Sequence, residues 1–292
     1  MRQLSIILLS FMLFSFSAHS QKLSVQWEEL TAGEFASAVK QSEGVCVIPM
    51  GVMEKHGQHL PLGTDVYTAR GVALKAAEKE YCIVYPYYFA GQIFEAKQQP
   101  GTIAYSPELI FKLLEETCEE IARNGIKKII LMNSHGGNPN FLQFFCQSQL
   151  AKQKDYAVYL FTPSVDDETE AKITKMLKSE RGFHGDEVET SLVMAIRPDL
   201  VKPERAKNEP GTDMNRLQLD NVYTGIWWYS KFPNHYAGEA QYSSAALGKV
   251  RLDQYYEQLA KVIKDVKADK ATLRLQDEFF KESLVPLDTK VK

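Results

Sequence analysis

Short apolar runs alternate with helical stretches along most of this chain, and this alternation restricts the fold more than any other feature. Apolar runs of strand length cover residues 45–50, 83–85, 128–132 and 157–161. Helical patterns cover 65–80, 140–152, 189–196 and a long tail from 243 to about 273. Strands that alternate with helices form parallel sheets covered on both faces. We therefore expect an α/β fold, a single layered domain with a mainly parallel sheet flanked by helices.

The segment after Ser106 carries the clearest helix signals. Ser106 is a good N-cap, Pro107 follows at the first helical position, and Gly125 comes just past the last apolar position. The pattern predicts a strong amphipathic helix before the strand that starts at Lys128.

The first twenty residues predict a signal peptide. Arg2 precedes an apolar run over 6–16, and Ala18-His19-Ser20 places small residues where a signal peptidase reads them. The alternative is a short membrane anchor, but a bilayer requires about twenty apolar residues. We expect cleavage before Gln21, a mature domain over 21–292, and a periplasmic or secreted protein.

Charge and cysteine content exclude several classes of partner and site. The net charge of −3 argues against nucleic acid or an anionic membrane as a partner, and no other apolar stretch is long enough to span a bilayer after signal cleavage. The four cysteines form no CxxC pair, which argues against a cysteine-built zinc site. We expect buried free thiols, although an exported protein could pair two of them.

A cluster of polar residues follows the first expected strand directly. Glu54, His56, His59 and Asp65 lie within twelve residues. Glu54 and His56 are two apart, so in an extended segment they point the same way. Carboxylates and imidazoles bind zinc, manganese and iron, and a carboxylate has two oxygens with which to bridge two ions. Alternatively, Asp65 only caps the following helix and the histidines are ordinary loop residues.

His135 occupies a second position suited to chemistry, at the carboxyl end of the apolar run 128–132. Gly136 and Gly137 follow it and allow the backbone to approach a ligand. The alternative is a helix-entry turn capped by Asn138.

A third cluster, from His184 to Glu189, brings another histidine and three acids to the start of an expected helix. Acids in a first helical turn are also favoured by the helix dipole alone, which is a sufficient explanation for Glu187.

Four blocks in order resemble the creatininase (creatinine amidohydrolase) family over roughly residues 26–265. The first is E-x-H-G-x-H-L-P-L-x-T-D at 54–65, and the second is P-G-T-I-x-x-x-P-E at 100–108. The third, N-G-H-G-G-N, is similar to residues 133–138. The fourth, H-A-G-x-x-E-T-S with R-P-D-L-V, is similar to 184–191 and 197–201.

This resemblance implies a single α/β layered domain, usually a homohexamer, with two divalent metal ions, Zn with Zn, Mn or Fe. One ion would be held by Glu54, Asp65 and His135, and the other by His56 and Asp65. Creatininase itself completes the second ion with a glutamate where this chain has Gly137. Glu189 is our candidate for that missing ligand, and the departure argues against creatinine as the substrate. Ala96 is a second departure, since many members carry histidine there.

The implied reaction is metal-assisted hydrolysis of a C–N bond in a small amide or cyclic amide. His184 would carry a proton to the leaving nitrogen, with Glu189 beside it. His59 could do the same or orient a ligand. Trp227, Trp228, Tyr229 and Tyr236 could line a pocket for a flat substrate, or simply pack in the core or an interface.

Three alternative functions remain open at this stage. The same site could deformylate a formamide or open a lactam or lactone. The chain could also be a non-catalytic metal- or ligand-binding member of the family.

Overall fold

The fold is described by a computed structural model that covers residues 23–180, 182–289 and 291. The expected signal peptide lies outside these residues. The sheet has four parallel strands in the order β2-β1-β3-β4. They are β1 (Val45–Met50), β2 (Ile83–Val84), β3 (Lys128–Asn133) and β4 (Ala157–Phe161). This is the parallel sheet that the alternating pattern predicts.

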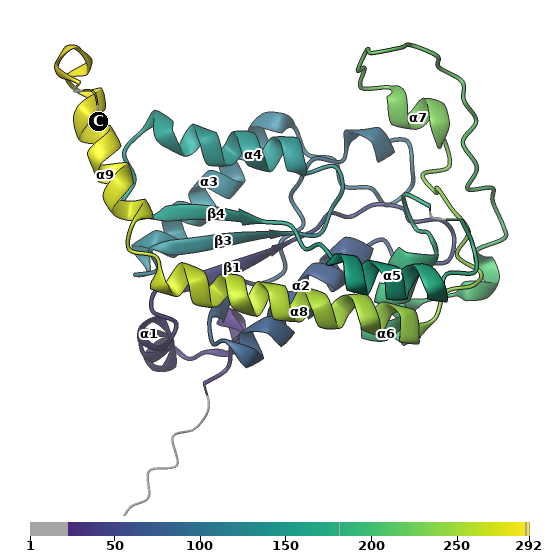
Figure 1. Cartoon of the computed structure of the whole chain (residues 1–292), viewed down its shortest axis with the longest axis horizontal. Helices are drawn as coiled ribbons and strands as arrows, with labels where there is room; N and C mark the ends of the chain where they lie inside the picture. The colour runs from purple at the N-terminus through teal and green to yellow at the C-terminus, as the bar shows by residue number, and fades with distance from the viewer. Residues whose placement is uncertain (1–22, 181, 290, 292) are drawn as a thin grey trace, which may run out of the picture.

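Helices cover both faces of the sheet (Figure 1). One face packs against α3 (Pro107–Arg123) and α4 (Pro139–Ser148), and the other against α2 (Thr64–Lys79), α6 (Glu187–Ile196) and α8 (Ala245–Ala268). The strand side chains alternate between the two cores. Cys46, Ile48 and Met50 lie in the first core, and Val45 and Val47 lie in the second. Both faces of β1 are fully buried, which explains its unbroken apolar sequence.

Four further helices complete the described chain: α1 (Ala32–Gln41), α5 (Asp167–Met176), α7 (Trp227–Lys231) and α9 (Thr272–Ser283). The sequence pattern did not identify α1, α5, α7 or the part of α9 beyond residue 273. It also treated 243–273 as one helix, whereas α8 ends at Ala268 and α9 begins at Thr272. The break lies at Asp269, whose carboxylate accepts hydrogen bonds from the backbone of Ala271 and Thr272 and from the Tyr159 hydroxyl.

The register of β1 and β3 places two loops side by side. Met50 pairs with Asn133 at the ends of the strands, and the Ser134 N–H donates to the Met50 carbonyl over 3.0 Å. The loop that carries Glu54 and the turn that carries His135 therefore leave the sheet at the same edge, where sites form in parallel α/β proteins.

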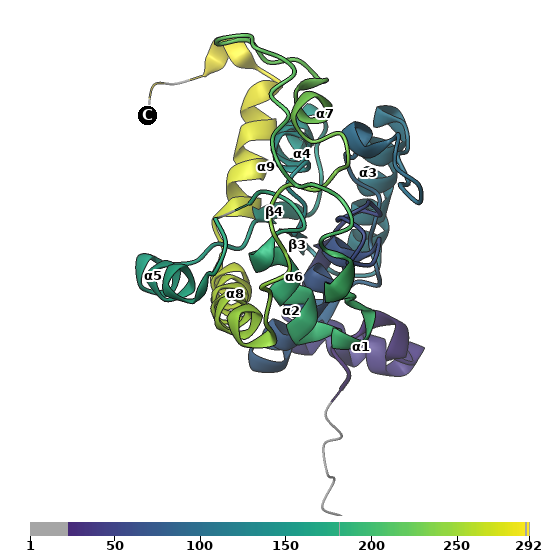
Figure 2. The ribbon, with the colours of Figure 1, turned by 90° about the vertical axis from the view of Figure 1, so that its right-hand side faces the viewer.

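A long segment, residues 207–226, runs without a helix or strand before α7. In Figures 1 and 2 this segment and α7 stand apart from the sheet, on the side of α4. Several of its large apolar side chains are exposed: Met214, Leu219, Val222, Tyr223 and Ile226.

The structure bears on two expectations from the sequence, one for the cysteines and one for helices that could cross a membrane. All four cysteines are free thiols, and Cys46, Cys82 and Cys118 are buried, as expected. Among the described residues, no helix combines the length and the apolar character that crossing a bilayer requires.

Candidate metal centre

The first ligand candidates come from the loop after β1 and from the start of α2. Gly51 makes their proximity possible, because a Cβ there would lie 2.5 Å from the Val66 nitrogen and 2.6 Å from the Asp65 carbonyl carbon. The loop is closed by a hydrogen bond from the Glu54 N–H to the Leu62 carbonyl. Glu54, His56 and Asp65 are each no more than 2% exposed. Asp65 lies in the first turn of α2, but its carboxylate faces the histidines of the site.

His135 meets these residues from the end of β3. Its Nδ1 lies 2.8 Å from Glu54 Oε1 and 3.0 Å from Asp65 Oδ2. Its Nε2 lies 2.9 Å from the Gln92 carbonyl oxygen, to which it donates. A backbone carbonyl at one ring nitrogen orients the other toward an ion, as is usual for metal-binding histidines.

Glu189, in the first turn of α6, reaches the same cluster. Its Oε1 lies 3.5 Å from His56 Nε2, and the same nitrogen lies 3.3 Å from Asp65 Oδ1. The Gly185 N–H donates to Glu189 Oε2 and fixes the side chain. Asp186 caps α6 by accepting from the Glu189 N–H. The third cluster of the sequence is therefore part of the site.

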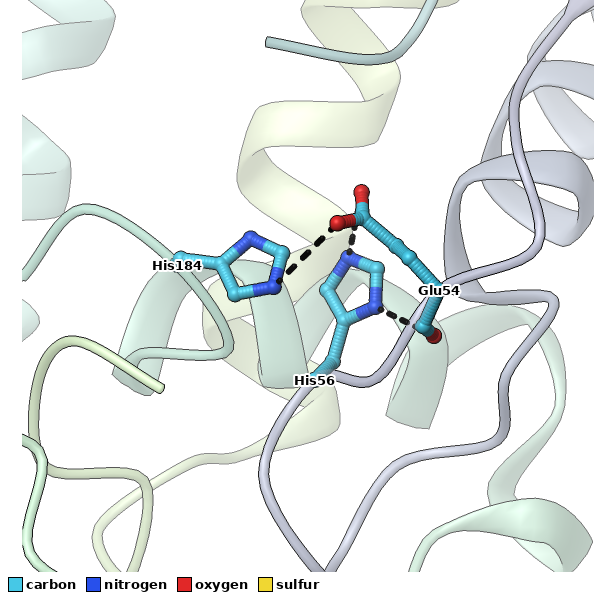
Figure 3. Close-up of side chains that lie close together, drawn as sticks. All are labelled: Glu54, His56 and His184. Atoms are coloured by element: carbon cyan, nitrogen blue, oxygen red, sulfur yellow. Dashed lines mark hydrogen bonds and ion pairs between the residues drawn. The ribbon is translucent and has the colours of Figure 1, made fainter. Parts of the chain in front are cut away.

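These residues form overlapping groups that could hold a metal ion. Glu54, Asp65 and His135 make one group, and His56, Asp65 and Glu189 make another. Asp65 belongs to both. A third group is Glu54, His56 and His184, and Figure 3 shows both histidines next to the Glu54 carboxylate.

The cluster fits a divalent cation on two further observations. Glu54 Oε1, His56 Nε2 and Asp65 Oδ2 are buried and make no well-aligned hydrogen bond, although the two carboxylate oxygens lie 2.8 and 3.0 Å from His135 Nδ1. Buried polar atoms that lack good hydrogen bonds are costly, and metal ions bound to these atoms would remove that cost. Three carboxylates in a buried space also require positive charge nearby.

The pKa shifts of the candidate ligands also fit a site for a cation. Burial opposes the charge of Glu54, but His135, His184 and His56 outweigh it and hold the pKa of this carboxyl well below its usual range. Burial likewise opposes protonation of His56 and His135, yet the facing carboxylates raise the pKa of both rings well above 6.5. A metal ion bound to these rings would compete with their protons.

His184 lies beside His56, and its Nε2 is 3.7 Å from Glu54 Oε2 (Figure 3). Its ring stacks on His56 with centroids 4.1 Å apart, and its Nε2 donates to the Lys55 carbonyl over 2.8 Å. Its Nδ1 lies 3.9 Å from Glu189 Oε2. Burial, followed by the charge of His56, lowers the pKa of His184 to about 4.

His59 points away from the ligand cluster. Its Nε2 lies 3.0 Å from the Gly185 carbonyl oxygen and 2.9 Å from the Thr190 hydroxyl. The ring therefore ties the loop after β1 to the loop and first turn that carry Glu189. This position suits the second of its two expected roles, orienting a ligand.

The two departures from the family pattern have a clear structural setting. A Cβ at Gly137 would lie 2.4 Å from Gln92 Oε1 and 2.5 Å from His135 Nε2, so a side chain cannot fit there without moving Gln92. Ala96 is fully buried against an apolar cluster with Val52 and Ile93. Neither position supplies a ligand.

A cavity of about 350 Å³ opens beside the candidate ligands. Asp65, His135 and Glu189 line it, together with Gly136, and it extends to Arg251 of α8. Trp227, Trp228, Tyr229 and Tyr236 do not line this cavity. Tyr236 lines a second cavity of about 470 Å³.

Sequence reasoning missed one residue of the site. His235 is 2% exposed, and its Nε2 donates to Glu54 Oε2. The available signal was weak: a histidine within a Trp- and Tyr-rich stretch that has no metal-binding spacing of its own.

The model of the family described as "Creatininase: Creatinine amidohydrolase" matches residues 28–263. The chain belongs to the creatininase family. It is similar to a creatinine amidohydrolase of Pseudomonas putida, with 28% identity over 62% of this chain and 75% of the relative. It is also similar to a 3-dehydro-scyllo-inosose hydrolase of Thermotoga maritima, with 24% identity over 83% of each chain.

The fold is likewise that of a solved creatininase described as "Creatininase Mn". The TM-score is 0.70 at 23% identity, over 83% of this chain and 98% of that structure. The chain is therefore a hydrolase of a family that includes enzymes acting on amide C–N bonds, and its cluster of His, Glu and Asp is a potential site for divalent metal.

Proposed function

We propose that this chain is a two-metal amidohydrolase that cleaves a C–N bond in a small amide or cyclic amide. The observation that carries the proposal is the pair of ligand groups that share Asp65. Glu54, Asp65 and His135 would hold one ion, and His56, Asp65 and Glu189 the other. Zn with Zn, Mn or Fe suits this set of carboxylates and imidazoles.

Two such ions supply a nucleophilic water at neutral pH and polarise a carbonyl. The chain's own residues do the rest. Gly136 lines the cavity without a side chain, so its backbone N–H can donate to an oxyanion there. The cavity admits only a small substrate, because about 350 Å³ is at the low end for ligand sites.

We assign proton transfer to His184 together with Glu189. His184 does not line the cavity, whereas Glu189 does. The Nε2 of His184 donates to a backbone carbonyl, so Nδ1 is the free nitrogen. It can take up a proton from the Glu189 side, where it lies 3.9 Å from Oε2, and return it to the leaving nitrogen. His59 positions Glu189 by holding the Gly185 carbonyl and Thr190.

The test compares two variants that remove one or both groups. Asp65→Ala should lose both ions and all turnover, while Glu189→Gln should keep the ion at Glu54 and His135 and lose the other. Metal content per chain is measured by plasma mass spectrometry after dialysis. Two ions retained by Asp65→Ala would contradict the shared role of Asp65.

Turnover should be screened on the metal-loaded protein with creatinine, formamidopyrimidines and small lactams and lactones. Release of an amine from an amide supports the proposal. Activity on lactones alone would identify a different hydrolase, and inactivity on a broad amide set would favour a binding role.

We also propose that the chain is exported and assembles as a homo-oligomer, a hexamer by analogy with the family. Export rests on residues 1–20, and N-terminal sequencing of the protein from its native host would test cleavage before Gln21. Oligomerisation is supported by the exposed apolar side chains of 214–226, which a partner subunit would cover. Light scattering would give the mass in solution.

A further inference from the structure

Trp228 and His235 form a hydrogen-bonded pair, and the indole N–H determines which nitrogen of His235 accepts and which one donates. Trp228 Nε1 donates to His235 Nδ1 over 2.8 Å. An indole N–H can only donate, so Nδ1 of His235 is the acceptor and carries no proton. The ring's remaining nitrogen, Nε2, is therefore the N–H donor in this pair.

That N–H is aimed at a candidate metal ligand. His235 Nε2 donates to Glu54 Oε2. The other carboxylate oxygen, Oε1, is buried and lies 2.8 Å from His135 Nδ1 and 3.8 Å from His56 Nε2, both candidate ligand atoms. The two oxygens of Glu54 thus have different neighbours. Oε2 accepts the hydrogen bond from His235, and Oε1 faces the other candidate ligands.

The backbone of His235 and the aromatic neighbours of both residues hold the pair in place. His235 has a positive φ of 53°, a backbone conformation that a non-glycine residue keeps only where its surroundings determine it. Trp228 packs on Phe232 with centroids 4.9 Å apart and meets His184 edge-on at 5.8 Å. His235 also meets His184 edge-on at 4.5 Å. Helix α7 and the turn after it therefore form a rigid support beside the site.

We propose that Trp228 and His235 are positioning residues that orient the Glu54 carboxylate for metal binding. The pair comes from the segment that contributes no ligand of its own, so its effect on the metal passes through Glu54. This inference rests on the proposed role of Glu54 as a ligand. Loss of a group that orients a ligand typically weakens metal affinity about 10- to 100-fold.

The chain offers a matched set of variants. Trp228→Phe keeps an aromatic ring and removes the donor to His235. His235→Leu removes the donor to Glu54, and His235→Gln can restore an N–H toward it. Trp227→Phe is the control, because this neighbouring tryptophan lies on the same helix, is 39% exposed, and makes no hydrogen bond through its indole in the described part of the chain.

The full-length holoenzyme is stripped with a chelator, and Zn²⁺ affinity is then measured by competition with a chromophoric chelator. We expect Trp228→Phe to bind one ion about tenfold more weakly and His235→Leu up to about 100-fold more weakly. His235→Gln should recover part of that loss, and Trp227→Phe should match the wild type. Thermal unfolding of the metal-free proteins is recorded alongside, and affinities are measured well below each midpoint.

The outcomes separate the two proposals. If Glu54→Gln keeps both ions, Glu54 is not a ligand and the proposed metal centre itself is wrong. If Glu54→Gln loses an ion while Trp228→Phe and His235→Leu bind as the wild type does, the positioning role is wrong. A lower unfolding midpoint with unchanged affinity would likewise overturn it, because the pair would then serve only the fold.

Discussion

Two regions build this site in different ways. The loops after β1 and β3 supply Glu54, His56, Asp65 and His135 at strand ends that the sheet holds in register. The segment from 207 to α7 and His235 has little regular structure, yet it reaches Glu54 through a single hydrogen-bonded pair. Residues at the ends of paired strands are placed by the topology, whereas residues of an irregular segment are placed by particular contacts.

The largest expected effect tests the first region. Gly51→Ala would put a Cβ against the backbone at Asp65 and Val66 and push the start of α2 away from the strand end. We expect a loss of about 3 kcal/mol or more in the free energy of unfolding, together with loss of bound metal.

Chemical unfolding and metal analysis measure both effects. The control is Gly33→Ala in α1, where a Cβ meets no atom within 4 Å. A Gly51→Ala protein with normal stability and two bound ions would show that the strand-end geometry is less restrictive than we infer.

The next effect concerns His59, which joins two parts of the site. Burial lowers the pKa of His59 from 6.5 to about 4, and the hydrogen bond to the Gly185 carbonyl opposes this shift only in part. The folded state thus favours the neutral ring. The stability that this contributes is present above pH 6.5 and is lost as the pH falls from there toward 4.

Urea unfolding of the metal-free proteins at pH 7 and pH 4.5 measures this contribution. His59→Gln removes the titration, so the wild type should lose about 2–3 kcal/mol more than the variant between these two pH values. Equal losses would show that His59 titrates normally in the folded protein.

The smallest effect on the stability of the single chain is expected for changes in the irregular segment 207–226. Leu219→Ser and Tyr223→Ser replace exposed side chains, so the free energy of unfolding of the monomer should change by less than about 0.5 kcal/mol. If these residues cover a subunit contact, the same variants should dissociate the oligomer in light-scattering measurements. Strong destabilisation of an isolated monomer would instead mean that the segment packs on its own domain.

Most of the fold could be predicted from the sequence because its strands are short, almost unbroken apolar runs. The structure confirms β1 and β4 at the expected bounds, and β3 extends by one residue to Asn133. Helix α3 begins at Pro107 after the Ser106 cap, as expected. Helix α1 was missed although its capping box, Thr31 with Glu34, could be read from the sequence.

The site residues also differ in how well the sequence predicts them. The structure brings Glu54, His56, Asp65, His135 and Glu189 together, because each lies at a strand end or at the start of the helix that follows a loop. His235 could not be placed, since its position depends on the indole of Trp228 and on a positive φ. Such contacts between distant segments leave no periodic pattern in the sequence.

The contact between Gly137 and Gln92 has a consequence for changing this enzyme. The Cβ of a glutamate at 137 would lie 2.4 Å from Gln92 Oε1 and 2.5 Å from His135 Nε2, so both side chains would have to shift before its carboxylate could reach an ion. Exchange of one carboxylate for another at the second ion therefore involves residue 92 as well as residues 137 and 189. An evolutionary path between the two ligand sets has to make room at residue 92, and a designer who begins at 137 has to let the His135 ring shift as well.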